Sequence, residues 1–134
     1  MAKLEQIEGI GQKYADQLRA AGVRSSRSLL EKGGTASGRQ GIARKAGVSG
    51  KLVLEWVNHV DLFRIKGVGE EYADLLEEAG VDTVIELAQR NPASLYEAIM
   101  ETNQQKNLVR RPPSRKMVSD WVDMAKKLPR KVYY

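Results

Sequence analysis

The sequence predicts an all-α protein, and three observations support this class. No segment alternates apolar and polar residues with the turn signals that mark β-strands. Apolar residues recur instead at helical spacing, and Ser, Asn, Pro and Gly lie where helices would begin and end. The 134 residues include no cysteine, which excludes disulfides and thiolate metal sites. A chain of this length can bury one ordinary core or two small linked ones.

The chain contains an internal repeat. Residues 7–23 recur at 65–81 with a constant offset of 58, and ten of the seventeen positions are identical. Farther along, residues 51–57 match 116–122 at an offset of 65, so the second copy carries seven additional residues, expected within 101–111. The sequence therefore predicts two tandem repeats of short helices, at 1–63 and 64–134. The second repeat has a seven-residue insertion and a basic C-terminal tail.

The first repeat is expected to begin with a glycine turn that leads into a helix. Residues 3–7 leave room for a short helix or none, and 12–21 form the helix that follows the turn. Ser25 and Ser26 are candidate N-caps for another short helix, which the two glycines at 33–34 end.

Two further helices complete the first repeat. One begins near Ser37 and Gly38 and stops at Gly47. Ser49 can cap the next helix. Its apolar stripe consists of Val53, Trp56, Val60 and Phe63.

The second repeat carries similar signals. Asn91 and Pro92 form a good N-cap and first-turn pair for one helix. Ser114 caps the last helix, which runs to about Leu128. The residues at 130–134 are expected to be loosely ordered.

The repeated segment reads as a hairpin that leads into a helix. Gly9 and Gly11 can take positive φ and expose backbone N–H groups, while the apolar residue between them points inward. Ala15 and Leu18 follow four and seven residues after the second glycine. This pattern resembles the helix-hairpin-helix motif, and the whole chain resembles uncharacterised bacterial proteins built from a duplicated helix-hairpin-helix module. The resemblance implies a SAM-like fold and a module that holds nucleic-acid phosphates on hairpin N–H groups.

A second segment of the first repeat echoes this hairpin. Residues 47–51 repeat the order of 9–13: Gly, an apolar residue, a small residue, a spacer and Lys. Because the first N–H groups of a helix lack partners and carry the positive end of its dipole, such segments favour anions. The alternative is that these glycines and serines only turn the chain and cap helices. The predicted phosphate contacts are Gly9, Gly11, Gln12, Lys13, Gly47, Ser49, Gly50 and Lys51.

The second repeat departs from this pattern. Glu70 and Glu71 replace Gln12 and Lys13, and would repel a phosphate. We therefore expect the second hairpin to support the fold or to face a protein through an acidic cluster: Glu70, Glu71, Asp74, Glu77 and Glu78. A basic group in this repeat remains a candidate nucleic-acid contact, with a solvated face as the alternative: Arg110, Arg111, Arg115 and Lys116.

No catalytic or metal site is expected. His59 is the only histidine, and a surface or packed side chain is its expected role. The recurring Tyr14 and Tyr72, like Trp56 and Trp121, are expected to pack rather than to stack on bases. No nucleophile, base and orienting group can be assembled, so the chain is not expected to be an enzyme or to need a cofactor.

The charge distribution favours a polyanionic partner. The net charge is +5, and residues 1–63 carry ten Lys or Arg against six Asp or Glu. No stretch approaches the length of a membrane span, so the protein is expected to be cytoplasmic without a membrane partner. We expect non-sequence-specific binding of DNA or other nucleic acid. The alternative is a protein-interaction module that binds a protein partner or itself through the acidic second hairpin.

Overall fold

The computed structural model describes residues 3–7 and 9–134. Within these residues, helices alternate with turns and no strand is present, so the predicted all-α class is confirmed. No helix in this part of the chain combines the length and the apolar character needed to cross a membrane. The chain divides into two compact units: Met1–Asp61 with Lys131–Tyr134, and Leu62–Arg130.

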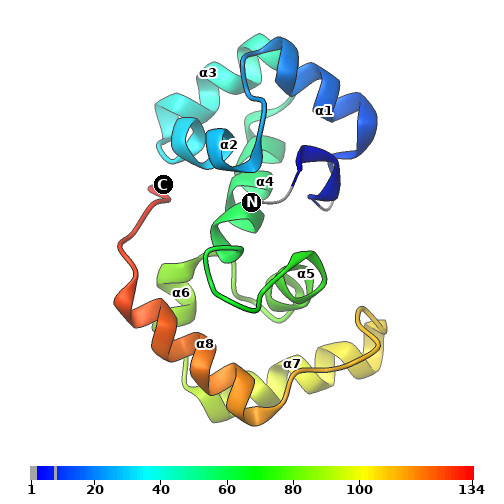
Figure 1. Cartoon of the computed structure of the whole chain (residues 1–134), viewed down its shortest axis with the longest axis vertical. Coiled ribbons are helices and arrows are strands. Elements are labelled where there is room, and N and C mark those ends of the chain that lie inside the picture. Colours follow the sequence, from blue (N-terminus) through cyan, green and yellow to red (C-terminus); the bar gives the residue numbers. More distant parts are fainter. Residues whose placement is uncertain (1–2, 8) are drawn as a thin grey trace. The chain divides into compact units, whose positions relative to one another are not determined.

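The first unit contains a short 3₁₀-helix and four α-helices (Figure 1). The short first helix is η1, Leu4–Gln6, which packs against α1, Gly11–Ala20. The next helices are α2, Ser26–Gly33, and α3, Ala36–Ala46, and α3 packs against both α1 and α2. The last is α4, Gly50–Leu62, which ends at the boundary of the unit.

Side-chain caps and left-handed glycines determine where these helices begin and end. Ser25 accepts the amide of Ser28 at 3.1 Å, as predicted for the start of α2. Thr35 accepts the amide of Gly38, so α3 begins at Ala36, before the predicted start. Gly47 ends α3 with a φ of 71°, and its prediction as a helix end is confirmed.

The C-terminal tail is ordered, so the expectation of a loose tail is wrong. The Tyr133 amide donates to the Gly34 carbonyl at 2.7 Å, and Val132 is buried. The buried Arg39 guanidinium donates to the carbonyls of Gly33 at 2.9 Å and Tyr133 at 2.7 Å. Burial lowers the pKa of Arg39, and interaction with Tyr134 opposes this shift. The tail therefore belongs to the first unit rather than to the second repeat.

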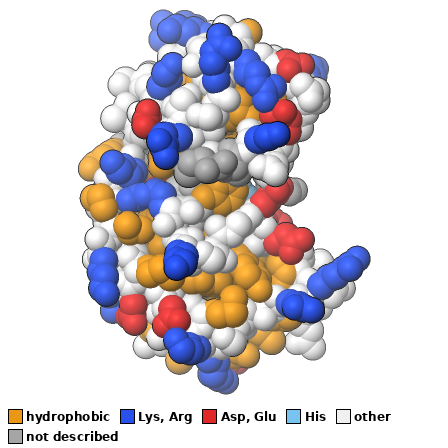
Figure 2. Space-filling model, in the orientation of Figure 1, with side chains coloured by type: hydrophobic (Ala, Val, Ile, Leu, Met, Phe, Trp, Pro, Cys, Tyr) orange, Lys and Arg blue, Asp and Glu red, His pale blue; other side chains and the backbone are white. Residues whose placement is uncertain are grey.

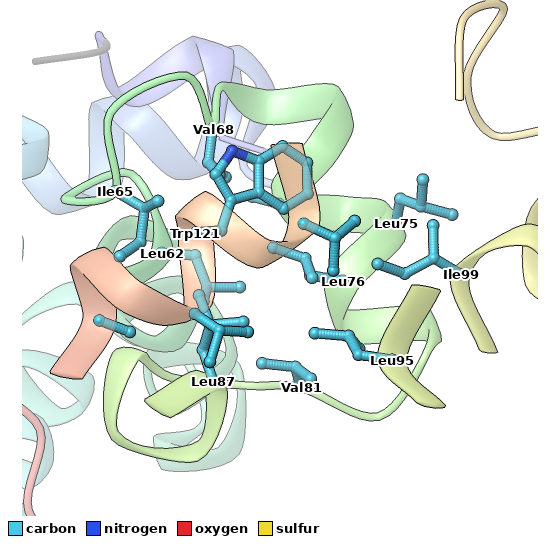
Figure 3. Packing of buried hydrophobic residues seen from close by; sticks show 14 of the residues in the cluster. Leu62, Ile65, Val68, Leu75, Leu76, Val81, Leu87, Leu95, Ile99 and Trp121 are labelled. Atoms are coloured by element: carbon cyan, nitrogen blue, oxygen red, sulfur yellow. The ribbon is translucent and has the colours of Figure 1, made fainter. Parts of the chain in front are cut away.

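The second unit contains four helices: α5, Glu70–Glu78; α6, Val84–Ala88; α7, Pro92–Lys106; and α8, Arg115–Lys127. The last helix packs against α6 and α7, and α5 packs against α7. The apolar core between these helices is continuous (Figure 3). Its largest fully buried members are Leu62, Ile65, Leu75, Leu76, Leu87, Leu95 and Ile99.

Side-chain caps also begin three helices of the second unit, and those at Asn91 and Ser114 were predicted. Thr83, Asn91 and Ser114 each accept a backbone amide from the first turn of the helix that they begin. The additional residues of the second repeat lie largely after α7. This helix ends at Asn107, which has a φ of 52°, and the loop 107–114 then leads to α8. In the first repeat, only residues 47–49 separate the corresponding helices.

Candidate nucleic-acid interface

The first hairpin has the backbone conformation that its glycines predict. Gly9 and Gly11 have φ values of 85° and 59°, in the region that side chains disfavour. Ile10 lies between them, is 2% exposed, and donates its amide to the Ile7 carbonyl at 3.1 Å. The hairpin is therefore closed by its own backbone and held to the core by one buried side chain.

The helix that follows this hairpin begins without a side-chain cap. In the described chain, α2, α3, α4, α6, α7 and α8 each begin with a Ser, Thr or Asn side chain that accepts a backbone amide. At α1 and α5, which follow the two glycine hairpins, the N-cap side chain makes no such bond. Gly11, Gln12 and Lys13 open α1 and are all exposed. This exposed first turn therefore has no side-chain cap for its amides, which carry the positive end of the helix dipole.

The side chains of this first turn differ in their availability. Lys13 makes no ion pair or hydrogen bond with the described residues, whereas Gln12 donates to Asp16 at 2.8 Å. Arg19 bridges Asp16 and Glu5, at 3.5 Å and 2.5 Å. A backbone hydrogen bond, followed by Arg19, lowers the pKa of Glu5. Glu5 and Asp16 thus have cationic or polar partners, while Lys13 is exposed.

The second predicted segment of the first repeat has a partly structural role. The Gly47 amide donates to Ala43 at the end of α3, and the Ser49 hydroxyl accepts the Leu52 amide at 3.1 Å. These two residues end one helix and cap the next, which is the alternative that the sequence left open for them. Gly50 and Lys51 begin α4 and are exposed. Their amides precede the Leu52 amide that Ser49 caps. Of the four residues predicted in this segment, Gly50 and Lys51 therefore remain candidate phosphate contacts.

Contacts within the first unit connect both segments. Gln17 of α1 donates to the Ala46 carbonyl at 3.0 Å, directly before Gly47. A Cβ added at Gly9 would lie 3.7 Å from the indole nitrogen of Trp56 on α4. The hairpin therefore lies against α4, and α1 is joined to the end of α3, within the first unit.

The second hairpin has the same turn but a different entry to its helix. Gly67 has a φ of 91° and Val68 is buried, like their counterparts in the first hairpin. Gly69 has a φ of −97°, in the extended region, so the positive φ of the first copy does not recur there. Glu70 and Glu71 occupy the first turn of α5, as predicted.

The four basic residues predicted in the second repeat do not form one group. Arg110 and Arg111 lie beside the second hairpin, where they line a pocket with Glu70 and Glu71. Arg115 lies elsewhere, 4.4 Å from the Tyr96 ring centre and 3.2 Å from a Glu97 oxygen. Lys116 pairs with Asp120 at 3.0 Å.

The predicted acidic cluster is largely occupied by internal interactions. Glu78 pairs with Lys106 on α7. Glu70, Asp74 and Glu77 also have interaction partners within the chain. Among the described residues, no group of three or more His, Asp or Glu is arranged to hold a metal ion.

The sequence did not reveal the aromatic support beneath each hairpin. Tyr14 and Trp56 pack with ring centres 5.1 Å apart, and Tyr72 and Trp121 with centres 5.2 Å apart, both at 54°. The packing role predicted for these residues is confirmed, and His59 is likewise packed, being 2% exposed. The one hint in the sequence was that Trp56 and Trp121 occupy matching positions of the two repeats, at an offset of 65. This match does not show that each tryptophan packs on the tyrosine of its own hairpin.

The net charge of the molecule lies entirely in the first unit. Residues 1–61 and 131–134 carry eleven Lys or Arg against six Asp or Glu, which gives +5. Residues 62–130 carry eleven of each, which gives zero. In Figure 2, basic side chains gather over the part of the first unit that contains α1 and α3. The charge of the first unit as a whole therefore favours an anionic partner.

The geometry thus defines a class of all-α proteins in which two glycine hairpins each lead into a helix without a side-chain cap. The chain belongs to the family described as Domain of unknown function (DUF4332), whose model matches residues 8–128. No curated protein and no solved structure is significantly similar to the chain.

Proposed function

We propose that the two repeats are helix-hairpin-helix modules and that the first unit binds the phosphate backbone of DNA. The observation that carries the proposal is the exposed, uncapped start of α1, which includes Lys13, a lysine whose side chain makes no ion pair with the described residues. Backbone amides at a helix N-terminus and a nearby cation are the groups that phosphate prefers in proteins. The net charge of +5 on this unit supports the same partner.

The binding is not sequence-specific in this proposal. Gly11, Gly50 and the backbone amides beside them can reach phosphates but have no side chain with which to read a base. Lys13 and Lys51 supply charge without a fixed bidentate geometry. The expected dissociation constant is on the order of 10⁻⁴ to 10⁻⁶ M at physiological salt.

The second hairpin takes no part in this contact. Glu70 and Glu71 replace Gln12 and Lys13, and a carboxylate about 4 Å from a phosphate costs on the order of 1 kcal/mol even in water. The contrast between the hairpins makes the proposal testable residue by residue.

The alternative function, docking of a partner on the acidic second hairpin, has weaker support. A docking surface of that kind needs carboxylates that are free to meet a cation. Glu78 already pairs with Lys106, and three of the other four carboxylates in the cluster have internal partners.

Fluorescence anisotropy with a labelled DNA duplex tests the proposal on the full chain. Between about 50 and 200 mM salt, we expect the affinity to fall steeply. In a chain with both Lys13→Gln and Lys51→Gln, the slope of log binding constant against log salt concentration should become shallower by about 2. Lys116→Gln is the matched control, because Lys116 pairs with Asp120 in the other unit. An unchanged slope in the double variant would refute the assigned contacts. A duplex RNA of equal length determines whether the module prefers DNA.

A further inference from the structure

The positive charge of the first unit is concentrated in one part of it. Residues 20–47, which run from the end of α1 through α2 and α3, carry six Lys or Arg against one Glu, which gives +5. The rest of the unit carries five basic and five acidic residues, which gives zero. Five of the six basic side chains in residues 20–47 are exposed, and the sixth, Arg39, is buried. One acid cannot neutralise five exposed cations, so this part of the surface attracts anions.

An open pocket of about 330 Å³ lies in this part of the first unit. Lys32 from α2 and Lys45 from α3 line it, and none of the described residues that line it is an Asp or Glu. The other lining residues are Ala21, Gly38, Gly41 and Ile42. Those that come from α3 recur at spacings of three and four residues, so they share one face of the helix. The pocket thus combines two cations with a wall of small and apolar residues.

A hydrogen bond holds one of the two cations in place. The Lys32 ammonium donates to the Gly22 carbonyl at 2.8 Å, just beyond the end of α1. This bond uses one of the three N–H donors of an ammonium group, and a carbonyl oxygen does not neutralise the charge. A cation that is already positioned loses less conformational entropy when it binds an anion. Lys32 is therefore suited to hold a ligand in this pocket.

The two glycines in the wall of the pocket differ in what requires them. A Cβ added at Gly38 would lie 2.0 Å from the Lys32 carbonyl oxygen, so the close packing of α2 on α3 requires a glycine there. A Cβ added at Gly41 would meet nothing within 4 Å beyond the backbone of its own helix. Glycine in the interior of a helix is destabilising relative to alanine. The described chain therefore gives no packing reason for Gly41, and the missing side chain leaves space in the pocket.

The lining residues favour a phosphate group among the anions. A lysine ammonium is a compact charge that binds phosphate without a fixed bidentate geometry, whereas a carboxylate is matched best by the planar fork of an arginine. A phosphate ester carries up to two negative charges near neutral pH, which two lysines balance. Ala21 and Ile42 add apolar contact, which suits the carbon atoms of an attached sugar.

We infer that the pocket lined by Lys32 and Lys45 binds a phosphate group. Two sources can supply it. A phosphate of the DNA backbone would make the pocket a second contact of the first unit, and in that form the inference rests on the proposed function. Free phosphate or a small phosphate ester would make it a separate site, which does not depend on DNA binding.

An NMR titration of the ¹⁵N-labelled full chain with inorganic phosphate, at constant ionic strength, tests the site. We expect saturable shifts at the amides of Gly38, Gly41 and Ile42. The chain with both Lys32→Gln and Lys45→Gln should bind phosphate at least about tenfold more weakly, because two charge-assisted hydrogen bonds are lost.

Two further variants separate a defined site from a general effect of charge or folding. Arg24→Gln with Arg27→Gln is the matched control, since it removes the same charge from residues 20–47 at positions that do not line the pocket, and it should bind phosphate as the parent does. Gly41→Leu fills the pocket without changing the charge and should weaken phosphate binding. Its melting temperature should equal or exceed that of the parent, because leucine is the better helix former and the position has room.

Fluorescence anisotropy with a DNA duplex identifies the source of the phosphate. If the DNA backbone occupies the pocket, the slope of log binding constant against log salt concentration should become shallower by about 2 in the Lys32→Gln, Lys45→Gln chain. An unchanged slope, with phosphate binding present in the parent, assigns the pocket to a small phosphate ligand. Lys13→Gln with Lys51→Gln should leave the phosphate shift at Gly41 unchanged, which separates failure of the proposed function from failure of this inference.

Three results would overturn the inference. The first is the absence of a saturable phosphate shift at the amides of the pocket. The second is equal phosphate binding by the parent and the Lys32→Gln, Lys45→Gln chain. The third is an equal loss of binding in the Arg24→Gln, Arg27→Gln chain, which would show a diffuse response to charge in place of a site.

Discussion

The two hairpins share a seventeen-residue pattern, and they differ in the positions that face solvent rather than in those that face the core. The buried Ile10 and Val68 lie between glycines at equivalent places, and a Tyr–Trp pair packs beneath each hairpin with nearly equal geometry. At the surface, Lys13 is replaced by Glu71, and a loop with two exposed arginines, Arg110 and Arg111, borders the second hairpin. The comparison teaches that the two copies share the buried support of an uncapped helix start, whereas the charged groups around that start differ.

Exchange of the two charge patterns should produce the largest effect. Gln12→Glu with Lys13→Glu gives the first hairpin the acids of the second. We expect DNA affinity to fall roughly a hundredfold, because three units of charge change and each is worth on the order of 1 kcal/mol near a phosphate. Anisotropy at low salt measures the loss. Glu70→Gln with Glu71→Lys is the reciprocal chain, and a loss of affinity there would contradict the division of roles.

Removal of the Asn103 side chain, which holds the inserted loop at Val109, should have the next largest effect. Asn103→Ala leaves the amide and carbonyl of Val109 without their partners, and should lower the free energy of unfolding by about 1–3 kcal/mol. Chemical denaturation followed by circular dichroism measures the change. Asn107→Gly is the control, because Asn107 is exposed and its φ of 52° suits glycine. Equal stability of the two variants would mean that Asn103 does not hold the loop.

The second glycine of each hairpin provides a test of backbone conformation. Gly11→Ala forces a side chain into a φ of 59° and should cost about 1–2 kcal/mol in unfolding free energy. Gly69→Ala should be neutral or slightly stabilising, since its φ is −97° and an added Cβ meets no atom within 4 Å. The same denaturation experiment compares them. A larger loss for Gly69→Ala would show that the two hairpins do not differ as described.

The smallest expected effect is a pH dependence in the second unit. Partial desolvation, and then repulsion from Glu86, raises the pKa of Asp82. A raised pKa in the folded state means that the folded chain binds more protons, so this group lowers stability as pH rises from the unfolded value through the folded one. Asp82→Asn should therefore slightly raise the melting temperature at pH 7, and should leave it unchanged well below the ordinary carboxyl pKa. A lower melting temperature at pH 7 would reverse the sign of this contribution.

Local signals explain why so much of the fold could be predicted from the sequence. The caps at Ser25, Asn91 and Ser114 act within one helical turn, and the end of α3 at Gly47 depends on a single backbone conformation. The packing of the tyrosines and tryptophans followed from their recurrence in the repeat. Interactions between residues a few positions apart can be recognised in the sequence, because the residues that make them follow one another closely in the chain.

The features that were missed depend on residues distant in the chain. Arg39 becomes buried because the carbonyl of Tyr133, 94 positions later, completes its hydrogen bonds, and no local pattern shows that the tail returns to the first unit. The inserted loop lies beside the second hairpin through Tyr72 and Arg111, which are 39 positions apart. For the candidate site, the sequence predicted the glycine turn at 9–11 and exposed lysines beside it, but it could not separate Ser49, which caps α4, from Gly50 and Lys51, which make no such cap.

The most direct test of the central claim is an NMR titration of the ¹⁵N-labelled full chain with a short DNA duplex at low salt. We predict saturable shifts at the amides of Gly11, Gln12 and Lys13 that are lost as salt is raised, and no comparable shifts at Gly69, Glu70 and Glu71. Shifts that are larger at the second hairpin, or absent from both, would contradict the claim that the first hairpin holds the DNA backbone.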